Sequence, residues 1–222
     1  MASSAPPLAA APKPRTIFYI DGLNFYYGAV RPTPALKWLD IARYCRLLRP
    51  HDDIVLIRYF SALIIGPNRP NQEAYLKALS TTPLVEMTLG RFKNKSVKCN
   101  VVPACAMAGS KWYSMPEEKR TDVNIAVFML DDAYRDVCDQ FIIFSGDSDL
   151  VPSVNMVRLR FPKKKIIVYV PSQNPVRGAA VELRTSAHVN RTLPIQLLSK
   201  SQFPDTIPDG SGGTLTRPAS WK

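Results

Sequence analysis

The sequence predicts an α/β domain in which a mainly parallel central sheet is flanked by helices. Two observations support this prediction. Short apolar runs with the length of strands alternate with longer segments whose apolar residues have helical spacing. In addition, residues 141–144 are apolar without any polar alternation, which is typical of a central strand buried on both faces of a parallel sheet.

The expected elements alternate along the chain, because helical segments separate most of the strand-like runs. Strands are expected at residues 17–20, 54–57, 84–89, 141–144 and 166–170. Amphipathic helices are expected at residues 36–48, 71–80, 123–130, 150–160 and 176–184, followed by a short final segment at 191–198.

Two segments with a different composition bound this domain. Residues 1–15 are rich in Pro and Ala and lack the basic start of a signal peptide. Residues 205–222 are rich in Pro, Gly, Ser and Thr. Such compositions favour disorder, so we expect one domain at 16–204 between two disordered tails.

Composition and charge indicate the class of partner. Of the 222 residues, 46% are hydrophobic, and no apolar run approaches the length of a membrane span. The formal net charge of +11 would attract polyanions, which makes nucleic acid the expected partner, although many basic surfaces have no such role.

Cysteine and histidine usage argues against several site types. The four cysteines are scattered without zinc-site spacing, which predicts structural thiols in a reducing, cytoplasmic compartment. His51 and His188 lie far in sequence from the acidic motifs, so neither is a good candidate for a catalytic dyad.

Acidic side chains follow two of the expected strands. Asp21 ends the first apolar run, and Asp147 and Asp149 come just after the run at 141–144, beyond a turn at Gly146. The carboxyl ends of parallel strands meet at one edge of a sheet, where such folds bind ligands. We therefore expect these carboxylates to converge, although a turn in which Asp149 caps the next helix is the structural alternative.

Two further polar residues are candidates for the same edge. Asn24, three residues after Asp21, would orient a carboxylate or a phosphate, or would cap a helix. Asp122 precedes the apolar stripe of the helix at 123–130, so its carboxylate would face the sheet end. The helix dipole alone would also favour an acid there.

A basic segment follows the third expected strand. Arg91, Lys93, Lys95 and Lys98, with Phe92 between them, combine positive charge with an aromatic face, which suits a track along a nucleic-acid backbone. Lys119 is a further basic candidate for binding. A solvated edge strand protected by lysines is the alternative. The basic turn at 163–165 is a further candidate.

Residues 100–118 have the irregular composition of a long loop. If this loop closed over the site, Trp112 or Tyr113 would stack on a base; packing on the domain's own surface is equally compatible with the sequence.

Three ordered motifs resemble the signature blocks of the NYN domain family of PIN-like nucleases, with the LabA-like proteins as the nearest subgroup. They are YIDGLNFY at 19–26, KRTDV at 119–123 and SGDSD at 145–149. The resemblance implies a PIN-like three-layer fold and metal-dependent cleavage of RNA. It places Asp21, Asp122, Asp147 and Asp149 in the family's acidic cluster, accompanied by Asn24. Arg120 departs from the pattern, because many members have Gly there.

The chemistry of the expected cluster agrees with this implication. Carboxylates that converge at one edge repel one another, and oxygen ligands favour Mg²⁺ or Mn²⁺ over zinc. One or two such ions would lower the pKa of a bound water, which removes the need for a histidine base.

Two other functions fit parts of the sequence. The Gly146–Asp149 stretch is similar to the metal motif of haloacid-dehalogenase-like phosphatases, but Leu23 stands where that family needs a second Asp. The domain could instead be a non-catalytic RNA-binding or scaffolding module. The kind of RNA, single-stranded or structured, and any homo-oligomer stay open.

Overall fold

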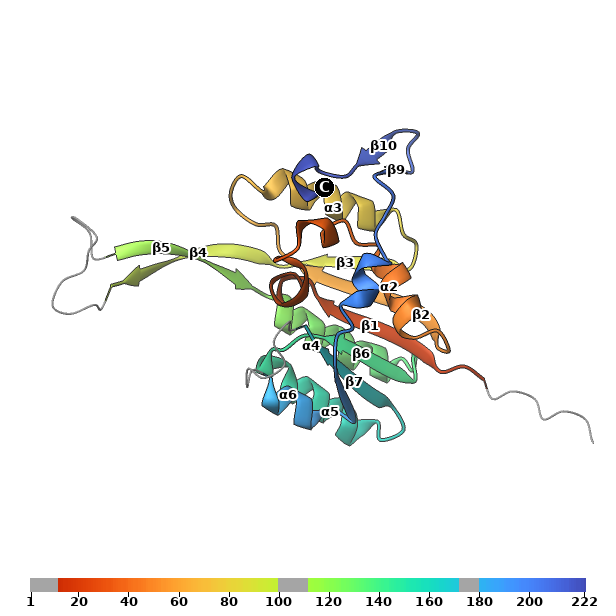
Figure 1. Cartoon of the computed structure of the whole chain (residues 1–222). Coiled ribbons are helices and arrows are strands. Elements are labelled where there is room, and N and C mark those ends of the chain that lie inside the picture. The colour runs from red at the N-terminus through yellow and green to blue at the C-terminus, as the bar shows by residue number, and fades with distance from the viewer. Residues whose placement is uncertain (1–11, 100–111, 172–179) are drawn as a thin grey trace, which may run out of the picture.

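A computed structural model describes residues 12–99, 112–171 and 180–222. Six strands form a central sheet in the order β3-β2-β1-β6-β7-β8, and every neighbouring pair in it is parallel (Figure 1). The prediction of five strands in one parallel sheet is confirmed. The strands are β1 (Arg15–Asp21), β2 (Asp53–Ser61), β3 (Val85–Leu89), β6 (Gln140–Phe144), β7 (Lys165–Val170) and β8 (Val189–Thr192).

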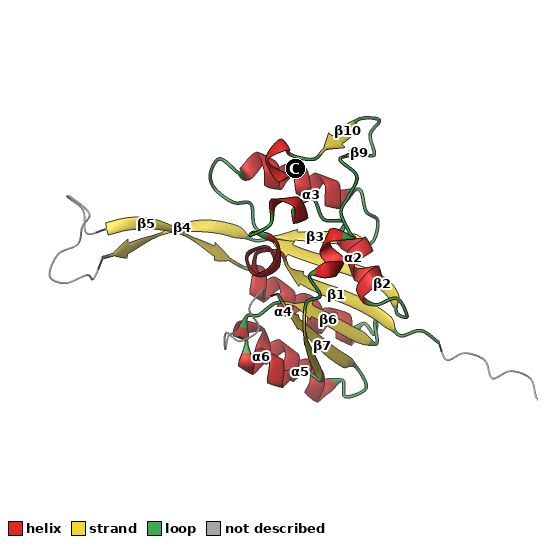
Figure 2. Cartoon of the chain, viewed as in Figure 1, coloured by secondary structure: helices red, strands yellow, loops and turns green. Residues whose placement is uncertain are grey.

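Helices cover both faces of the sheet, which gives the expected three-layer α/β fold (Figure 2). One face packs against α2 (Ile41–Leu48), α3 (Arg69–Ser80) and α7 (Gln196–Ser199). The other packs against α4 (Thr121–Tyr134), α5 (Val151–Arg160) and α6 (Val181–Ser186). Strand residues alternate between the two cores. None of the described helices has the length and apolar character to cross a bilayer.

Several helix boundaries differ from the expectation. The helix expected at 36–48 is a short 3₁₀ turn, η2 (Pro34–Leu36), followed by α2. The Asp40 carboxylate accepts a hydrogen bond from the Arg43 amide at 2.9 Å, so the α-helix begins at Ile41. Residues 176–179 of the helix expected at 176–184 lie outside the described residues.

A two-stranded antiparallel hairpin projects from the sheet (Figure 2). It consists of β4 (Arg91–Lys98) and β5 (Trp112–Lys119). The prediction of an irregular loop at 100–118 is therefore wrong for residues 112–118. Residues 100–111 lie outside the described residues. Gly90 joins β3 to β4, and a Cβ there would lie 2.6 Å from the Lys119 carbonyl oxygen. The close approach of the two chain segments therefore requires glycine.

The disordered tail expected at 205–222 is wrong. These residues form β9 (Thr206–Pro208), β10 (Thr214–Thr216) and η4 (Ala219–Trp221). Ile207, Leu215 and Trp221 pack against the buried Trp38, whose indole N–H donates to the Pro204 carbonyl at 2.8 Å. A few apolar anchors order this segment although its overall composition favours disorder.

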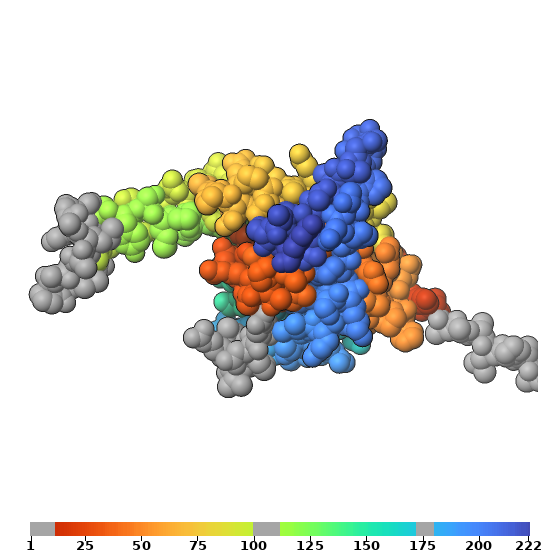
Figure 3. Space-filling model, turned by 45° about the horizontal axis from the view of Figure 1, so that its top comes forward, coloured from red at the N-terminus to blue at the C-terminus, as the bar shows by residue number. Residues whose placement is uncertain are grey.

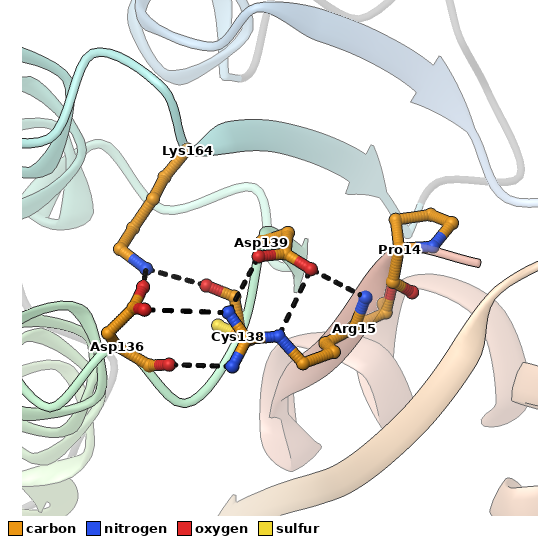
Figure 4. Close-up of polar contacts among 7 residues, drawn as sticks. Pro14, Arg15, Asp136, Cys138, Asp139 and Lys164 are labelled. Carbon is orange, nitrogen blue, oxygen red and sulfur yellow. Dashed lines mark hydrogen bonds and ion pairs between the residues drawn. The ribbon is translucent and has the colours of Figure 1, made fainter. Parts of the chain in front are cut away.

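A polar cluster links the amino ends of three central strands (Figure 4). Arg15, expected in the tail, instead begins β1 and pairs with Asp139 at 2.7 Å just before β6. Lys164 is 7% exposed and donates to the Asp136 carboxylate and the Cys138 carbonyl, both at 2.6 Å. Lys164 of the basic turn at 163–165 is thus engaged at the sheet edge opposite the acids. Residues 1–11 of the expected tail lie outside the described residues.

Asp132 is fully buried, although its place beside other acids predicts a solvated face. Its carboxylate accepts hydrogen bonds from Arg58 Nε and Nη2 and from the Tyr19 hydroxyl, all at 2.7 Å. Arg58 also lies over the Phe128 ring at 4.4 Å. The network joins α4 to β1 and β2 and so holds the helix that carries Asp122.

We expect Asp132→Ala to lower the free energy of unfolding by about 3–5 kcal/mol, because it leaves the buried Arg58 guanidinium without its main partner. Asp131→Ala is the matched control, since Asp131 is exposed and pairs with Arg135 at 3.3 Å; its loss should cost at most about 1 kcal/mol. Urea denaturation of both variants measures the difference. Equal losses would contradict a structural role for the buried network.

Candidate active site

The connections of the sheet create a crevice between β1 and β6. The chain leaves β1 toward β2 on one side and leaves β6 toward β7 on the other, so the strand order reverses between them. An open pocket of ≈ 590 Å³ lies at the carboxyl ends of these strands. Its lining includes α1 (Gly22–Phe25), the π-turn η1 (Tyr26–Val30), the base of the hairpin and the first turn of α4.

Asp21 lies at the end of β1 and is 5% exposed. One carboxylate oxygen accepts a hydrogen bond from the backbone N–H of Asn24 at 3.0 Å, and the other accepts one from the Ser145 hydroxyl at 3.1 Å. The Ser145 oxygen in turn accepts from the Asp147 amide at 3.1 Å. Ser145 thereby links the acid at the end of β1 to the acidic turn after β6.

Asn24 and Asp147 fix that turn from both sides. Asn24 Oδ1 accepts from the Gly146 amide at 3.0 Å, and Asp147 Oδ1 accepts from the Asp149 amide at 3.0 Å. Both side chains also line the pocket. Asp147 therefore combines a capping and a site position, whereas Asn24 lies within α1, whose N-cap is Asp21. Asp147, rather than Asp149, caps the following 3₁₀ turn, η3 (Ser148–Leu150).

Asp122 enters the pocket from the first turn of α4. Glu118 lines the pocket beside it and accepts a hydrogen bond from the Thr121 hydroxyl at the helix start. Between them, Arg120 has a φ of 86°, in the left-handed region that favours glycine. This backbone conformation explains why glycine suits position 120, where many members of the family that the motif resembles have Gly and this sequence has Arg.

The pocket is electrostatically uncompensated. Burial, together with the charges of Asp122 and Asp147, raises the pKa of Asp21 to about 6. Burial, followed by the charges of Asp147 and Glu118, also raises the pKa of Asp122 to about 6. Within the described part of the chain, no Lys or Arg forms an ion pair with any of these aspartates. A cation bound here would relieve the repulsion.

The donor chemistry fits a hard divalent cation, because the acidic lining offers carboxylate oxygens, which Mg²⁺ and Mn²⁺ prefer. The side chains are nevertheless not preassembled: the described residues contain no group of three Asp, Glu, His or Cys side chains close enough to hold one ion. Binding would therefore draw these carboxylates closer together.

Other predicted site residues lie away from the pocket lining. Asp149 is exposed, and its charge acts on Asp122. Phe92 and Glu118 are paired across the hairpin and line the pocket. Side chains alternate along a strand, so the predicted RNA-binding residues lie on the opposite hairpin face: Arg91, Lys93, Lys95 and Lys119.

The expected aromatic lid is also displaced from the pocket. Trp112 and Tyr113 are exposed on the part of β5 that pairs with Lys98 and Val97, far along the strand from Phe92. The aromatic residues that do line the pocket are Tyr27 and Phe92.

Sequence reasoning missed Ser145, Tyr27 and Glu118, and it placed Phe92 on a basic track rather than at the pocket. Ser145 had a detectable signal, because it is the first polar residue after a buried strand. Tertiary structure alone brings the others to the pocket: Tyr27, Phe92 and Glu118.

The raised pKa of Asp21 makes stability depend on pH. Between pH 3.8 and about 6, the folded state binds more protons at Asp21 than the unfolded state does. The stabilisation from protonated Asp21 is therefore complete below about pH 4 and is lost as the pH rises through about 6. Replacing Asp21 with Asn removes the cost of ionising this buried carboxyl group. The free energy of unfolding of the variant, relative to that of wild type, should therefore rise by on the order of 2 kcal/mol when the pH is raised from 4.5 to 7.5. Urea denaturation at both pH values measures this gain, with Asp131→Asn as the exposed control; a gain that does not change with pH would contradict it.

Comparisons with known proteins place the chain in a family. The chain is 30% identical, over 93% of its length and 75% of the relative's, to 6-hydroxy-3-succinoylpyridine 3-monooxygenase HspA of Pseudomonas putida. A crystal structure of VPA0982 from Vibrio parahaemolyticus, titled a protein of unknown function, is similar in fold, with a TM-score of 0.50, 19% identity and coverage of 82% of this chain and 93% of that one. The NYN domain model matches residues 15–191, and the chain belongs to the NYN domain family.

Proposed function

We propose that the chain is a metal-dependent endoribonuclease. One observation carries the proposal: Asp21, Asp122 and Asp147 line one pocket at the switch point of a parallel sheet, and no described basic residue neutralises them. Membership of the NYN domain family supports the same reaction class. Assignment to the LabA-like subgroup remains a prediction.

In this proposal, Asp21, Asp122 and Asp147 hold Mg²⁺ or Mn²⁺. When bound, the ion activates a water and stabilises charge on the scissile phosphate. Ser145 orients the Asp21 carboxylate through its hydroxyl, and Asn24 holds the Gly146 turn that carries Asp147. The open pocket admits a phosphodiester backbone, with Phe92 and Tyr27 at its walls.

We expect Asp122→Asn and Asp147→Asn to lower RNA cleavage by about 100-fold or more, the order found for loss of one charge-stabilising group. Each change keeps nearly the same volume, so the fold should persist. RNA binding in EDTA should be equal or slightly tighter, because a negative charge near the phosphate is gone. Cleavage in Mn²⁺, binding in EDTA and thermal stability with and without metal are measured for each variant.

Asp131→Asn provides the control for loss of an exposed acid from the same helix and should cleave like wild type. Asp149→Asn should cause a smaller loss than Asp147→Asn, because Asp149 lies outside the pocket lining. Equal cleavage by all variants would end the nuclease proposal. If wild type bound RNA but neither cleaved it nor gained stability from metal, a non-catalytic binding module would replace it.

The hairpin supplies the proposed RNA-binding surface. Arg91, Lys93 and Lys95 alternate along one face of β4, and Lys119 lies opposite Arg91 on β5. Glu117 partly offsets this charge, since it pairs with Lys119 at 2.9 Å and with Lys95 at 3.7 Å. Because this face is turned away from Phe92, RNA would have to pass around the hairpin to reach the acids.

Charge reversal at Lys93 and Lys95 should weaken RNA binding and flatten its salt dependence by about 0.7–0.9 in logarithmic slope per lost phosphate contact. Lys77→Glu changes an exposed charge on α3 and serves as the control. Affinity is measured in EDTA over a range of salt concentrations. An unchanged slope in Lys93→Glu and Lys95→Glu would assign these residues to a solvated hairpin.

A second candidate comes from the relative named a monooxygenase. Such a reaction inserts one oxygen atom of O₂ into the substrate and reduces the other to water with two electrons from a reductant. Incubation of the chain with 6-hydroxy-3-succinoylpyridine, O₂ and a reduced nicotinamide or flavin distinguishes the candidates. Substrate-dependent hydroxylation without any RNA cleavage would favour this second function.

A further inference from the structure

A second pocket of ≈ 390 Å³ adjoins the pocket lined by Asp21, Asp122 and Asp147, which we call the acid pocket. Leu23 and Tyr27 line both, so they form the partition between them. The second pocket is bounded by α1 and η1, by α3 and by the C-terminal turn η4. In Figure 3 the dark blue C-terminal residues lie against the orange-red residues of this region. We call it the aromatic pocket.

The walls of the aromatic pocket are largely ring faces and edges. Tyr26 and Tyr27 contact each other edge to face with ring centroids 5.3 Å apart, and Tyr75 contacts Tyr59 and Trp221 at 6.3 Å each. A volume of this size suits one small ligand. Aromatic side chains stack on a nucleobase of any identity, because each base has a π face.

Two hydroxyls that line the aromatic pocket have no hydrogen-bond partner among the described residues. Tyr59 is 5% exposed and Ser61 is 2% exposed, and neither hydroxyl makes a hydrogen bond to another described residue. Gln72, by contrast, is fixed by bonds to the Ile64 amide and the Ala62 carbonyl. Neither hydroxyl oxygen belongs to the fully buried polar atoms that lack a partner, so both face the open space of the pocket, where a ligand with polar edges would bond them.

Two cations lie at the aromatic pocket without carboxylate partners among the described residues. The Arg31 guanidinium is 5.3 Å from the centroid of Tyr27, and the Lys37 ammonium is 5.7 Å from that of Tyr26. A flat ring bearing an anionic group would use both the ring walls and these charges. A nucleotide has this combination of features.

The partition places such a nucleotide beside the acids. Gly22 follows Asp21, and a Cβ at Gly22 would lie 2.8 Å from the Tyr59 ring and hydroxyl. Glycine therefore lets the end of β1 pass directly against the aromatic pocket. A strand with one phosphate at the acids would have a neighbouring base within reach of Tyr27.

We propose that the aromatic pocket holds one unpaired nucleobase of the RNA strand, next to the phosphodiester bound at the acid pocket. This inference rests on the proposed ribonuclease function and adds the substrate class: single-stranded RNA, or RNA with one base turned out of a helix. Tyr27 stacks on the base, the Tyr59 and Ser61 hydroxyls bond its polar edge, and Arg31 contacts an adjacent phosphate.

The test measures binding of the full chain to a short single-stranded RNA in EDTA, where no cleavage occurs. Each nucleotide is replaced in turn by an abasic one. One position should lower wild-type affinity by about 5- to 100-fold, the range for loss of one stacked base. Tyr27→Ala should lower affinity for intact RNA by a similar factor and lose its sensitivity to that abasic position. Tyr134→Ala, an exposed tyrosine at the far end of α4, should behave like wild type.

Tyr59→Phe keeps the ring and removes the unpartnered hydroxyl, so its unfolding midpoint should stay unchanged while its preference among the four bases at the sensitive position changes. An abasic scan with no sensitive position, or fully paired RNA that binds as tightly as the single strand, would overturn the inference. Tyr27-dependent binding of 6-hydroxy-3-succinoylpyridine that RNA does not displace would identify a small-molecule site instead and would overturn the inference.

The two proposals fail separately. Cleavage in Mn²⁺ that is lost in Asp147→Asn but does not depend on Tyr27 or on any base would overturn the nucleobase pocket alone. Base-dependent binding through Tyr27, without cleavage by wild type in Mn²⁺ or Mg²⁺, would overturn the ribonuclease alone.

Discussion

The parallel pairing of β1 with β6 is the contact on which the candidate site depends. Ile20 pairs with Phe144, so the residues that follow, Asp21 and Ser145, leave the sheet side by side. The hydrogen bond between them is 3.1 Å long and connects residues that are 124 positions apart. Because the strand order reverses at this pair, no crossover helix covers the crevice above it. The same pairing therefore positions the acids and leaves them accessible.

Holding acids at this edge opposes folding, and the rest of the domain offsets that cost. The Asp21 carboxylate is buried, and its pKa is raised to about 6 by burial and by the neighbouring acids. The Asp132–Arg58–Tyr19 network secures α4 against β1 and β2, while the Arg15–Asp139 pair secures the opposite end of β1. Ion pairs lie at the amino edge of the sheet, and the uncompensated acids of the candidate site lie at the carboxyl edge.

A basic hairpin face and a second pocket surround the acids. The hairpin has a basic face and a face that lines the acid pocket, and the aromatic pocket adjoins the acids on the side of α1. The C-terminal turn closes the aromatic pocket through Trp221, which contacts Trp38 and Tyr75. The last residues of the chain thus contribute to the surroundings of the site although their composition resembles a loose tail.

The sequence by itself determined the parallel sheet and the convergence of Asp21, Asn24, Asp122 and Asp147, because apolar runs specify buried strands and parallel strands share their carboxyl edge. Tertiary structure decided what local pattern does not encode. Asp132 is buried because Arg58 on β2 meets it, residues 112–119 form a strand because β4 pairs with them, and three apolar anchors order residues 205–222. Each outcome depends on a partner distant in sequence, whose contact outweighs the local preference.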